Sequence, residues 1–229
     1  MKDNSGKYVK YLWDPNSYIN IMVYNFTTEP NSNSVTLGIS HIPFSTTGKH
    51  YLEGLGETDY SHLTLANLQF PLSVSINSLY INEESTPTEY STADIAVTLA
   101  HELGHYLGLH HVFAETDNGT CEDTDYCKDT KSYNKQEYDS KCDYIYENER
   151  EKYTFKNLVK RTGCDGIEFI SYNIMDYAIS YSNQFTQNQR ERIRHVLSYS
   201  PLIPGPKKGD IDTRALNEGP LDLPIRTIK

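Results

Sequence analysis

The sequence holds no run of eighteen or more apolar residues, the length that a helix needs to cross a bilayer. Its first ten residues, MKDNSGKYVK, contain no apolar segment of the kind found in secretory signals. We therefore expect no transmembrane segment, and neither a signal peptide nor a lipid anchor, within the printed sequence.

Basic residues are also scarce. The chain has 21 lysines and arginines against 31 aspartates and glutamates, and its net charge is -10. Because no run of basic residues interrupts this acidity, we expect no nucleic acid partner. Apolar residues make up 37% of the chain and charged residues 23%, which is typical of a soluble globular protein.

Cysteine is limited to four positions within one 44-residue segment: Cys121, Cys127, Cys142 and Cys164. Their spacing lacks the closely spaced pairs of structural zinc knuckles. The even number instead predicts two disulfides, and therefore an oxidising compartment. Four reduced thiols are the alternative, and the sequence does not choose among the three pairings that four cysteines allow.

The pattern of apolar and polar residues predicts both strands and helices. β-branched and aromatic residues favour strands within residues 17–30, 34–44 and 71–81, and residues 45–70 are expected to be mostly loop. In the third strand Val74 and Ile76 alternate with Ser73 and Ser75, which is typical of a half-buried or edge strand.

A helix is predicted over residues 91–108, with Ser91 as its N-cap and an apolar stripe facing the core: Ile95, Leu99, Leu103, Tyr106 and Leu107. Residues 114–170 are expected to be irregular in structure and cross-linked by disulfides. A last helix begins at Thr186 with the capping box TQNQ and buries Ile193, Val196 and Leu197. Five of the ten prolines follow Ser200, so residues 201–229 are expected to form an extended tail.

The stretch HELGHYLGLHH, residues 101–111, predicts a metal site. On a helix, His101 and His105 are one turn apart and face the same way. Gly108 allows the helix to end and the chain to turn back, so that His111 reaches the same ion. His110 differs by one position and should point elsewhere. Three imidazoles with an open fourth position are typical of catalytic zinc.

Glu102 lies beside a ligand but off the ligand face, so its carboxylate can reach a zinc-bound water without binding the metal. It can take a proton from that water as general base and pass it to a leaving amine as general acid. Two alternatives remain open: a helix with ordinary surface histidines, and a structural zinc without catalysis.

These residues, read as H-E-x-x-H-x-x-G-x-x-H, resemble the zinc signature of the metzincin metallopeptidases. The downstream YNIMDYAIS resembles their methionine turn, with Met175 as the methionine, and its N-x-M-D-Y form is similar to the pappalysin branch. DYCKDT, residues 125–130, is a further match. The resemblance implies that Met175 forms a floor beneath the histidines and that Tyr177 stabilises the oxyanion of the tetrahedral intermediate.

The resemblance also implies an α+β fold, with residues 1–200 as one metallopeptidase domain. A twisted mixed sheet and the zinc helix would form an upper lobe to about residue 110. An irregular, disulfide-bearing lower lobe would follow it. The strand within residues 71–81 takes the place of the edge strand that holds substrate. For the cysteines we expect the nested pairing of Cys121 with Cys164 and Cys127 with Cys142.

Calcium is a second cofactor suggested by the resemblance, through four acidic residues in one loop: Glu122, Asp123, Asp125 and Asp129. A solvated acidic loop is the alternative. Residues 131–160 have no counterpart in the family pattern and are expected to form a solvated loop or a flap that faces substrate. The segment after the methionine turn, AISYSNQF, lacks acidic residues that would favour basic substrate side chains.

The sequence therefore predicts a secreted or cell-surface zinc endopeptidase that acts on proteins or peptides. One alternative is a binding module of the same fold that keeps zinc without turnover. The other is a zinc hydrolase of a different class, whose third ligand is a distant glutamate.

Overall fold

The computed structural model describes residues 7–26, 35–58, 60–87, 89–116, 120–177, 179–208 and 225–228. It divides into two compact units, Met1–Leu109 with Glu191–Lys229, and His110–Arg190. No helix in the described part is both long enough and apolar enough to span a membrane. The end of the predicted strand segment 17–30, from residue 27 on, and most of the tail lie outside the described residues.

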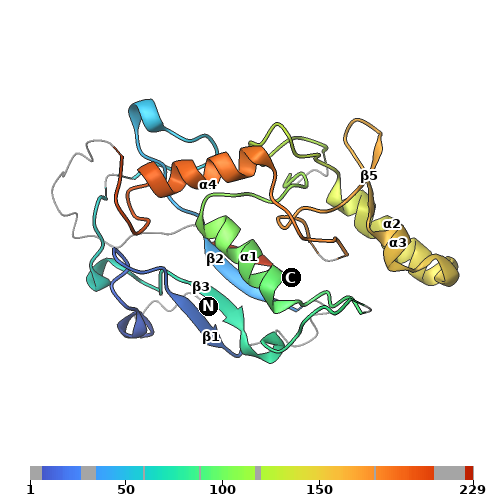
Figure 1. The fold of residues 1–229 in the computed structure, drawn as a ribbon, viewed down its shortest axis with the longest axis horizontal. Helices are drawn as coiled ribbons and strands as arrows, with labels where there is room; N and C mark the ends of the chain where they lie inside the picture. The colour runs from blue at the N-terminus through green and yellow to red at the C-terminus, as the bar shows by residue number, and fades with distance from the viewer. Residues whose placement is uncertain are drawn as a thin grey trace. The chain divides into compact units, whose positions relative to one another are not determined.

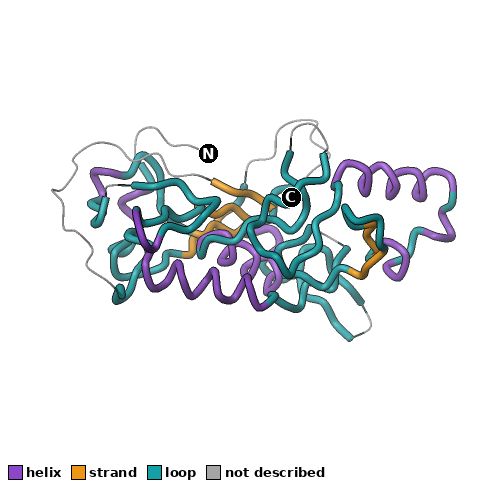
Figure 2. The backbone as a smooth tube through the Cα atoms, turned by 90° about the horizontal axis from the view of Figure 1, so that it is seen from above, coloured by secondary structure: helices purple, strands orange, loops and turns teal. Residues whose placement is uncertain are grey.

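The first unit contains a four-stranded mixed sheet in the order β1-β3-β2-β6 (Figures 1 and 2). Its strands are β1 (Ile21–Tyr24), β2 (Gly38–His41), β3 (Val74–Asn77) and β6 (Ile225–Ile228). β1 pairs with β3 in parallel, and β2 pairs antiparallel with both β3 and β6. The expectation of a mixed sheet is confirmed, and the sheet includes a strand from the segment expected to be a tail.

The expectation that the strand within residues 71–81 is an edge strand is wrong. β3 lies between β1 and β2, and all four of its residues are buried. The serines that suggested a solvent face are buried as well, and the hydroxyl groups of Ser73 and Ser75 are 3.3 Å apart. Because the two serine hydroxyls can hydrogen-bond to each other, they can be buried although β3 is paired with a strand on each side.

Helix α1 (Ile95–Tyr106) packs against β2 and β3 (Figure 1). Its N-cap is Asp94 and not Ser91, because the Asp94 carboxylate accepts hydrogen bonds from the backbone N–H groups of Ala96 and Val97. The predicted apolar stripe is confirmed. Four of its side chains pack against the core and Tyr106 is buried within it: Ile95, Leu99, Leu103, Leu107 and Tyr106.

Short 3-10 helices interrupt the loops of this unit: η1 (Val9–Tyr11), η2 (Gly48–His50), η3 (Leu65–Asn67) and η4 (Ser78–Tyr80).

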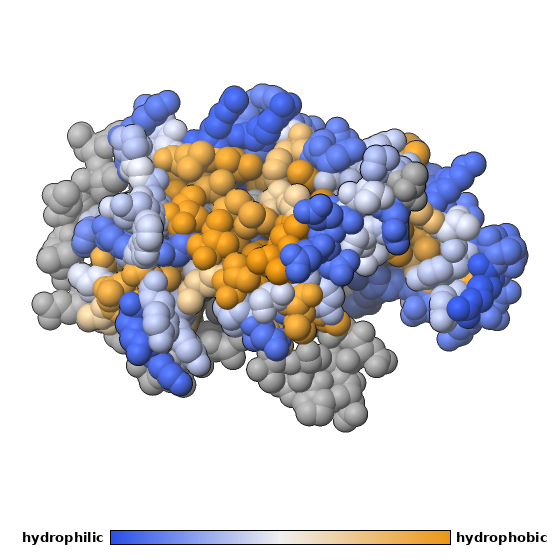
Figure 3. All heavy atoms as spheres, turned by 60° about the horizontal axis from the view of Figure 1, so that its bottom comes forward, coloured by the Kyte–Doolittle hydropathy of each residue, from blue (hydrophilic) through white to orange (hydrophobic). Residues whose placement is uncertain are grey.

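The face seen in Figure 3 carries a broad apolar area. Ile21 and Val23, alternate residues of β1, are each 48% exposed. Because alternate strand residues share a face, β1 contributes apolar surface to solvent.

Helix α4 (Gln187–Tyr199) begins at the predicted capping box. The Gln189 side chain accepts from the Thr186 N–H at 2.9 Å, and the Thr186 hydroxyl accepts from the Gln189 N–H at 3.2 Å. Val196 is buried as expected, but Leu197 is exposed and Arg192 is buried in its place.

The second unit contains helices α2 (Lys135–Asn148), η5 (Arg150–Lys152) and α3 (Phe155–Leu158), and a hairpin of β4 (Lys160–Thr162) with β5 (Glu168–Ile170). The prediction that residues 131–160 form a loop is wrong, because α2 is a regular helix of 14 residues. The Asn134 side chain caps this helix by accepting a hydrogen bond from the Glu137 N–H. Ile145 is the residue of the helix whose side chain is buried.

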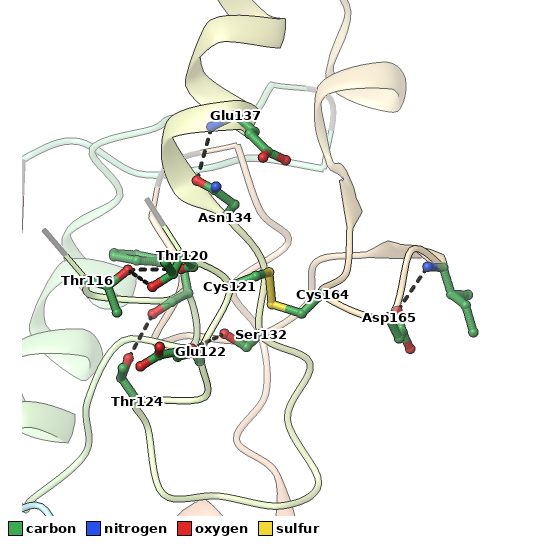
Figure 4. Close-up of a disulfide and its surroundings, with 12 residues drawn as sticks. Thr116, Thr120, Cys121, Glu122, Thr124, Ser132, Asn134, Glu137, Cys164 and Asp165 are labelled. Atoms are coloured by element: carbon green, nitrogen blue, oxygen red, sulfur yellow. Dashed lines mark hydrogen bonds between the residues drawn. A yellow bond between two sulfur atoms is a disulfide. The ribbon is translucent and has the colours of Figure 1, made fainter. Parts of the chain in front are cut away.

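Of the expected nested pairing, the bond between Cys121 and Cys164 is confirmed (Figure 4). It joins two loops whose Cα atoms are 5.4 Å apart. The second pair is wrong, because Cys127 is a buried thiol and Cys142 a half-buried one. Cys142 lies on α2 beside Tyr138, and burial raises the pKa of its thiol.

Candidate metal centre

Three histidines come together at the end of α1. One ring nitrogen from each of His101, His105 and His111 lies within 4.8 Å of the other two. His101 and His105 are fully buried, and His111 is 3% exposed. In the described part of the chain, no other group of three or more histidine, cysteine or acidic side chains is close enough to share one ion.

The turn after α1 brings His111 back toward the helix. Gly108 has a φ of 90°, and the N–H of Leu109 donates to the Gly104 carbonyl at 2.9 Å. A Cβ on Gly108 would lie 2.7 Å from the Val196 side chain, so both conformation and space favour glycine here. The Arg192 Nε donates to the Gly108 carbonyl at 2.6 Å and fixes the turn.

Hydrogen bonds orient two of the three rings. His105 Nδ1 lies 2.8 Å from the Leu109 carbonyl oxygen, which can only accept, so Nδ1 carries the proton. The Nε2 of His105 is then unprotonated, and its lone pair is available to a metal. This nitrogen lies 3.1 Å from His101 Nε2. His111 Nδ1 is 2.6 Å from the Glu115 carboxylate, which leaves Nε2 as its ligand atom. Partners of this kind fix the tautomer of metal-binding histidines.

His110 does not belong to the group of three. Its ring is buried and packs edge-on against Tyr126, with ring centroids 5.3 Å apart. The structure therefore separates the two adjacent histidines, and each has its own surroundings.

Glu102 is fully buried on α1 and lies beside strand β2. A Cβ built on Gly38 would stand 2.5 Å from Glu102 Cγ and 2.6 Å from Oε1. Any residue other than glycine at position 38 would therefore clash with the Glu102 side chain in its present position. The sheet and the helix thus determine together where this acid lies.

Met175 and Tyr177 belong to the second unit. Met175 is fully buried, and its carbonyl accepts from the Val112 N–H, directly after His111 in the sequence. The ring of Tyr177 packs edge-on against His111 and Phe113, with centroid distances of 4.7 and 4.8 Å. The methionine turn is therefore joined to the segment that carries the third histidine.

A buried ion pair supports this turn. The Asp176 carboxylate accepts from the Tyr133 hydroxyl at 2.6 Å and from the Tyr177 N–H at 2.8 Å. It also lies 3.3 Å from Arg161, and both side chains of the ion pair are fully buried. Burial, the largest single effect, would lower the pKa of Arg161, but Asp176, Tyr133 and Tyr138 together more than offset it and raise the pKa.

The acidic residues expected to bind calcium do not form such a group among the described residues. Asp129 accepts from the Asn188 N–H at 2.9 Å at the start of α4, and Asp125 accepts from the Cys127 N–H at 2.8 Å. Burial raises the pKa of Asp125 to about 7. Calcium binding stays a prediction from the sequence.

Two residues of the site were missed by sequence reasoning, Glu115 and Arg192. A carboxylate four residues after a ligand histidine was a usable signal for Glu115. Arg192 gave none, because its partner, the Gly108 carbonyl, is 84 residues away in the sequence.

Comparison of folds finds that the chain has a fold similar to that of a solved bacterial protein, mirolysin. A mutant of Tannerella forsythia promirolysin superposes with a TM-score of 0.50 and 20% identity, covering 88% of this chain and 55% of that one. Mature mirolysin of the same organism, solved with a cleaved peptide, has a TM-score of 0.49 and 21% identity, covering 85% of this chain and 58% of that one.

The family follows from the sequence. The family model Peptidase M43, described as pregnancy-associated plasma protein-A, matches residues 3–198. The chain belongs to this family, the pappalysin metallopeptidases.

Two curated relatives are named extracellular metalloproteases. That of Arthroderma benhamiae is 37% identical over 97 residues, and that of Arthroderma otae is 38% identical over the same length. Each match covers 42% of this chain and 29% of the relative, so the chain aligns with less than a third of those proteins.

Proposed function

We propose that this protein is a zinc-dependent endopeptidase that hydrolyses peptide bonds in proteins or peptides. The observation that carries the proposal is the convergence of His101, His105 and His111 on one point, next in sequence to a buried glutamate. Membership of a metallopeptidase family supports it.

The three histidines suit zinc as a ligand set. Neutral imidazole nitrogens are good zinc ligands, and three of them leave a fourth position open. The hydrogen bonds to Leu109 and Glu115 hold the neutral tautomers that ligation requires. Bound zinc supplies a Lewis acid that polarises the scissile carbonyl and makes water nucleophilic near neutral pH.

Glu102 and Tyr177 are assigned the remaining roles. Glu102, held by β2 in a buried position, accepts the proton of the attacking water and returns it to the leaving amine. The Tyr177 hydroxyl donates a hydrogen bond to the developing oxyanion. The packing of Tyr177 against His111 supports this assignment.

We further propose that the protein is secreted or attached to the cell surface. The curated relatives that match part of the chain are named extracellular, and Cys121 is bonded to Cys164, which suits an oxidising compartment.

Metal content measured together with cleavage of a peptide library tests the proposal. We expect one zinc per chain, cleavage that stops when a chelator removes the metal, and recovery when zinc is restored. Zinc at full occupancy without cleavage of any library peptide would favour the binding module of the same fold. Among the described residues the group that could share one ion contains three histidines and no glutamate, which supports the assignment of His111 as the third ligand.

Replacing His111 by alanine separates the two adjacent histidines. We expect His111→Ala to weaken zinc binding by more than about 100-fold, since even loss of an outer partner costs 10- to 100-fold. His110→Ala is the matched control and should bind zinc as the wild type does. Competition with a chromophoric chelator measures both, and equal affinities for the two variants would disprove the assignment.

Gly38→Ala tests whether β2 positions Glu102. The added methyl group must displace the Glu102 side chain, because the Cβ would lie 2.5 Å from its Cγ and 2.6 Å from its Oε1. A displacement of about 1 Å lowers kcat by about 100-fold. Gly56→Ala is the control, because a Cβ there meets Phe44 at an ordinary 3.6 Å. Steady-state kinetics on both variants decide the matter, and an unchanged kcat in Gly38→Ala would contradict it.

Tyr177→Phe removes the hydroxyl and keeps the ring packing. We expect kcat to fall by about 100-fold while KM changes little, because the hydroxyl acts on charge that develops in the transition state. A parallel rise in KM with kcat unchanged would assign Tyr177 to substrate binding instead.

A further inference from the structure

The strand β6 occupies one edge of the sheet beside the candidate site. It pairs antiparallel with β2, with Gly38 opposite Ile228 and Ser40 opposite Arg226. Cα atoms of β6 come within 8 Å of α1, the helix that carries Glu102. A four-residue strand from residues 225–228 therefore runs beside the helix of the metal site.

The hydrogen-bonding direction of β2 follows from its other neighbour. The Asn77 N–H donates to the Leu37 carbonyl, so Leu37 and Ile39 direct their main-chain groups toward β3. Because successive residues of a strand alternate in direction, the main-chain groups of Gly38 and Ser40 face β6. Their partners on β6 are the amides of Ile228 and Arg226, while Thr227 directs its amide away from β2.

Gly38 connects this edge to the catalytic carboxylate. It is the residue of β2 that leaves room for Glu102, and it is also the residue that pairs with Ile228. A chain that pairs with β2 through main-chain hydrogen bonds therefore runs close to Glu102, whatever its side chains are. An extended peptide that adds to a sheet edge uses the same contacts and needs the same amides.

We propose that β6 is an internal occupant of the β2 edge and competes there with an extended substrate peptide. The inference rests on the proposed function, since it identifies β2 as the strand on which substrate adds. β6 ends the strand order, so it is paired with the sheet on one side. A peptide that offers the same main-chain groups replaces it without disturbing β1 or β3.

Two proline variants of the whole chain test the competition. Arg226→Pro removes the amide that faces β2, and Thr227→Pro removes the amide that faces away, so the second is matched to the first. Loss of one hydrogen bond weakens the internal strand by about 3- to 10-fold. We expect KM for a peptide substrate to fall by about that factor in Arg226→Pro, with kcat unchanged, and to stay within about twofold in Thr227→Pro.

A binding measurement gives a readout that does not depend on catalysis. A fluorescent peptide with the sequence of residues 221–229, LDLPIRTIK, should bind Arg226→Pro more tightly than the wild type in an anisotropy titration. N-methylation of the peptide at the position of Arg226 should weaken binding by at least about 3- to 10-fold, and N-methylation at the position of Thr227 should change it by less than about twofold.

The outcomes separate the two proposals. Peptide binding of this pattern without cleavage by any variant would support the displaceable strand and refute the endopeptidase. Equal KM values in all three proteins, with no peptide binding, would overturn the inference. The same holds if Arg226→Pro melts well below Thr227→Pro and binds no peptide, because β6 would then be a fixed part of the sheet.

Discussion

Glu102→Gln is expected to lower kcat by about 100- to 10,000-fold, the range contributed by a positioned general acid and base. The amide is nearly isosteric with the carboxylate, so the space beside Gly38 stays filled. It cannot take up a proton from water at neutral pH. The loss should therefore appear in kcat, measured under saturating peptide, and leave KM within a few-fold of the wild type.

Metal content is the control for this variant. Glu102→Gln should hold as much zinc as the wild type, because Glu102 is not among the three clustered side chains. Loss of zinc together with activity would make Glu102 a ligand and contradict its assignment as the base. Activity within tenfold of the wild type would place the proton transfer on another group.

Asp176→Asn is expected to lower the free energy of unfolding by about 3–5 kcal/mol. The substitution leaves the Arg161 guanidinium buried beside a neutral amide, with its opposite charge removed. Urea unfolding at neutral pH measures the change as a shift of the midpoint at constant slope.

A second acidic residue of the same unit provides the comparison. Asp139 pairs with Lys135 on α2 and is about half exposed, so Asp139→Asn should cost less than about 1 kcal/mol. Equal effects of the two substitutions would show that the Arg161–Asp176 pair contributes no more than a surface ion pair. In that case the support of the methionine turn must come from its apolar packing.

The histidine cluster was predictable because all three histidines lie within one short segment of the sequence. A helical turn separates His101 from His105, and Gly108 ends the helix, so eleven consecutive residues determine most of the geometry. The capping box at Thr186 was predictable for the same reason. Both features depend on contacts between residues close in sequence.

Helix α2 was missed although its helical pattern was present. Tyr138, Cys142 and Ile145 follow the i, i+4, i+7 spacing of an inner face, and these side chains are buried or half-buried. The sequence pattern does not make this face conspicuous, because Cys142 is expected to form a disulfide and most other residues of the segment are charged or polar. On this face Ile145 is buried, and the Arg161 guanidinium lies over the Tyr138 ring at 3.8 Å.

The position of β3 inside the sheet was beyond the sequence pattern. Alternation of serine with valine and isoleucine is the same for a half-exposed strand and for one paired on both sides. The neighbours of β3 decide between them, and β2 in turn gains its second neighbour from residues 225–228. Such pairings between distant segments leave no trace in local spacing.

The bond from Arg192 to the Gly108 carbonyl has a consequence for the order in which the protein is made. The two residues are 84 positions apart, and Arg192 also donates to the Glu53 carbonyl, 139 positions earlier. A nascent chain that has not yet reached residue 192 holds all three histidines but lacks this anchor of their turn. Contacts of such long range form late and slow the folding of a domain. We therefore expect the histidines to become fully ordered only after synthesis has passed residue 192 in α4.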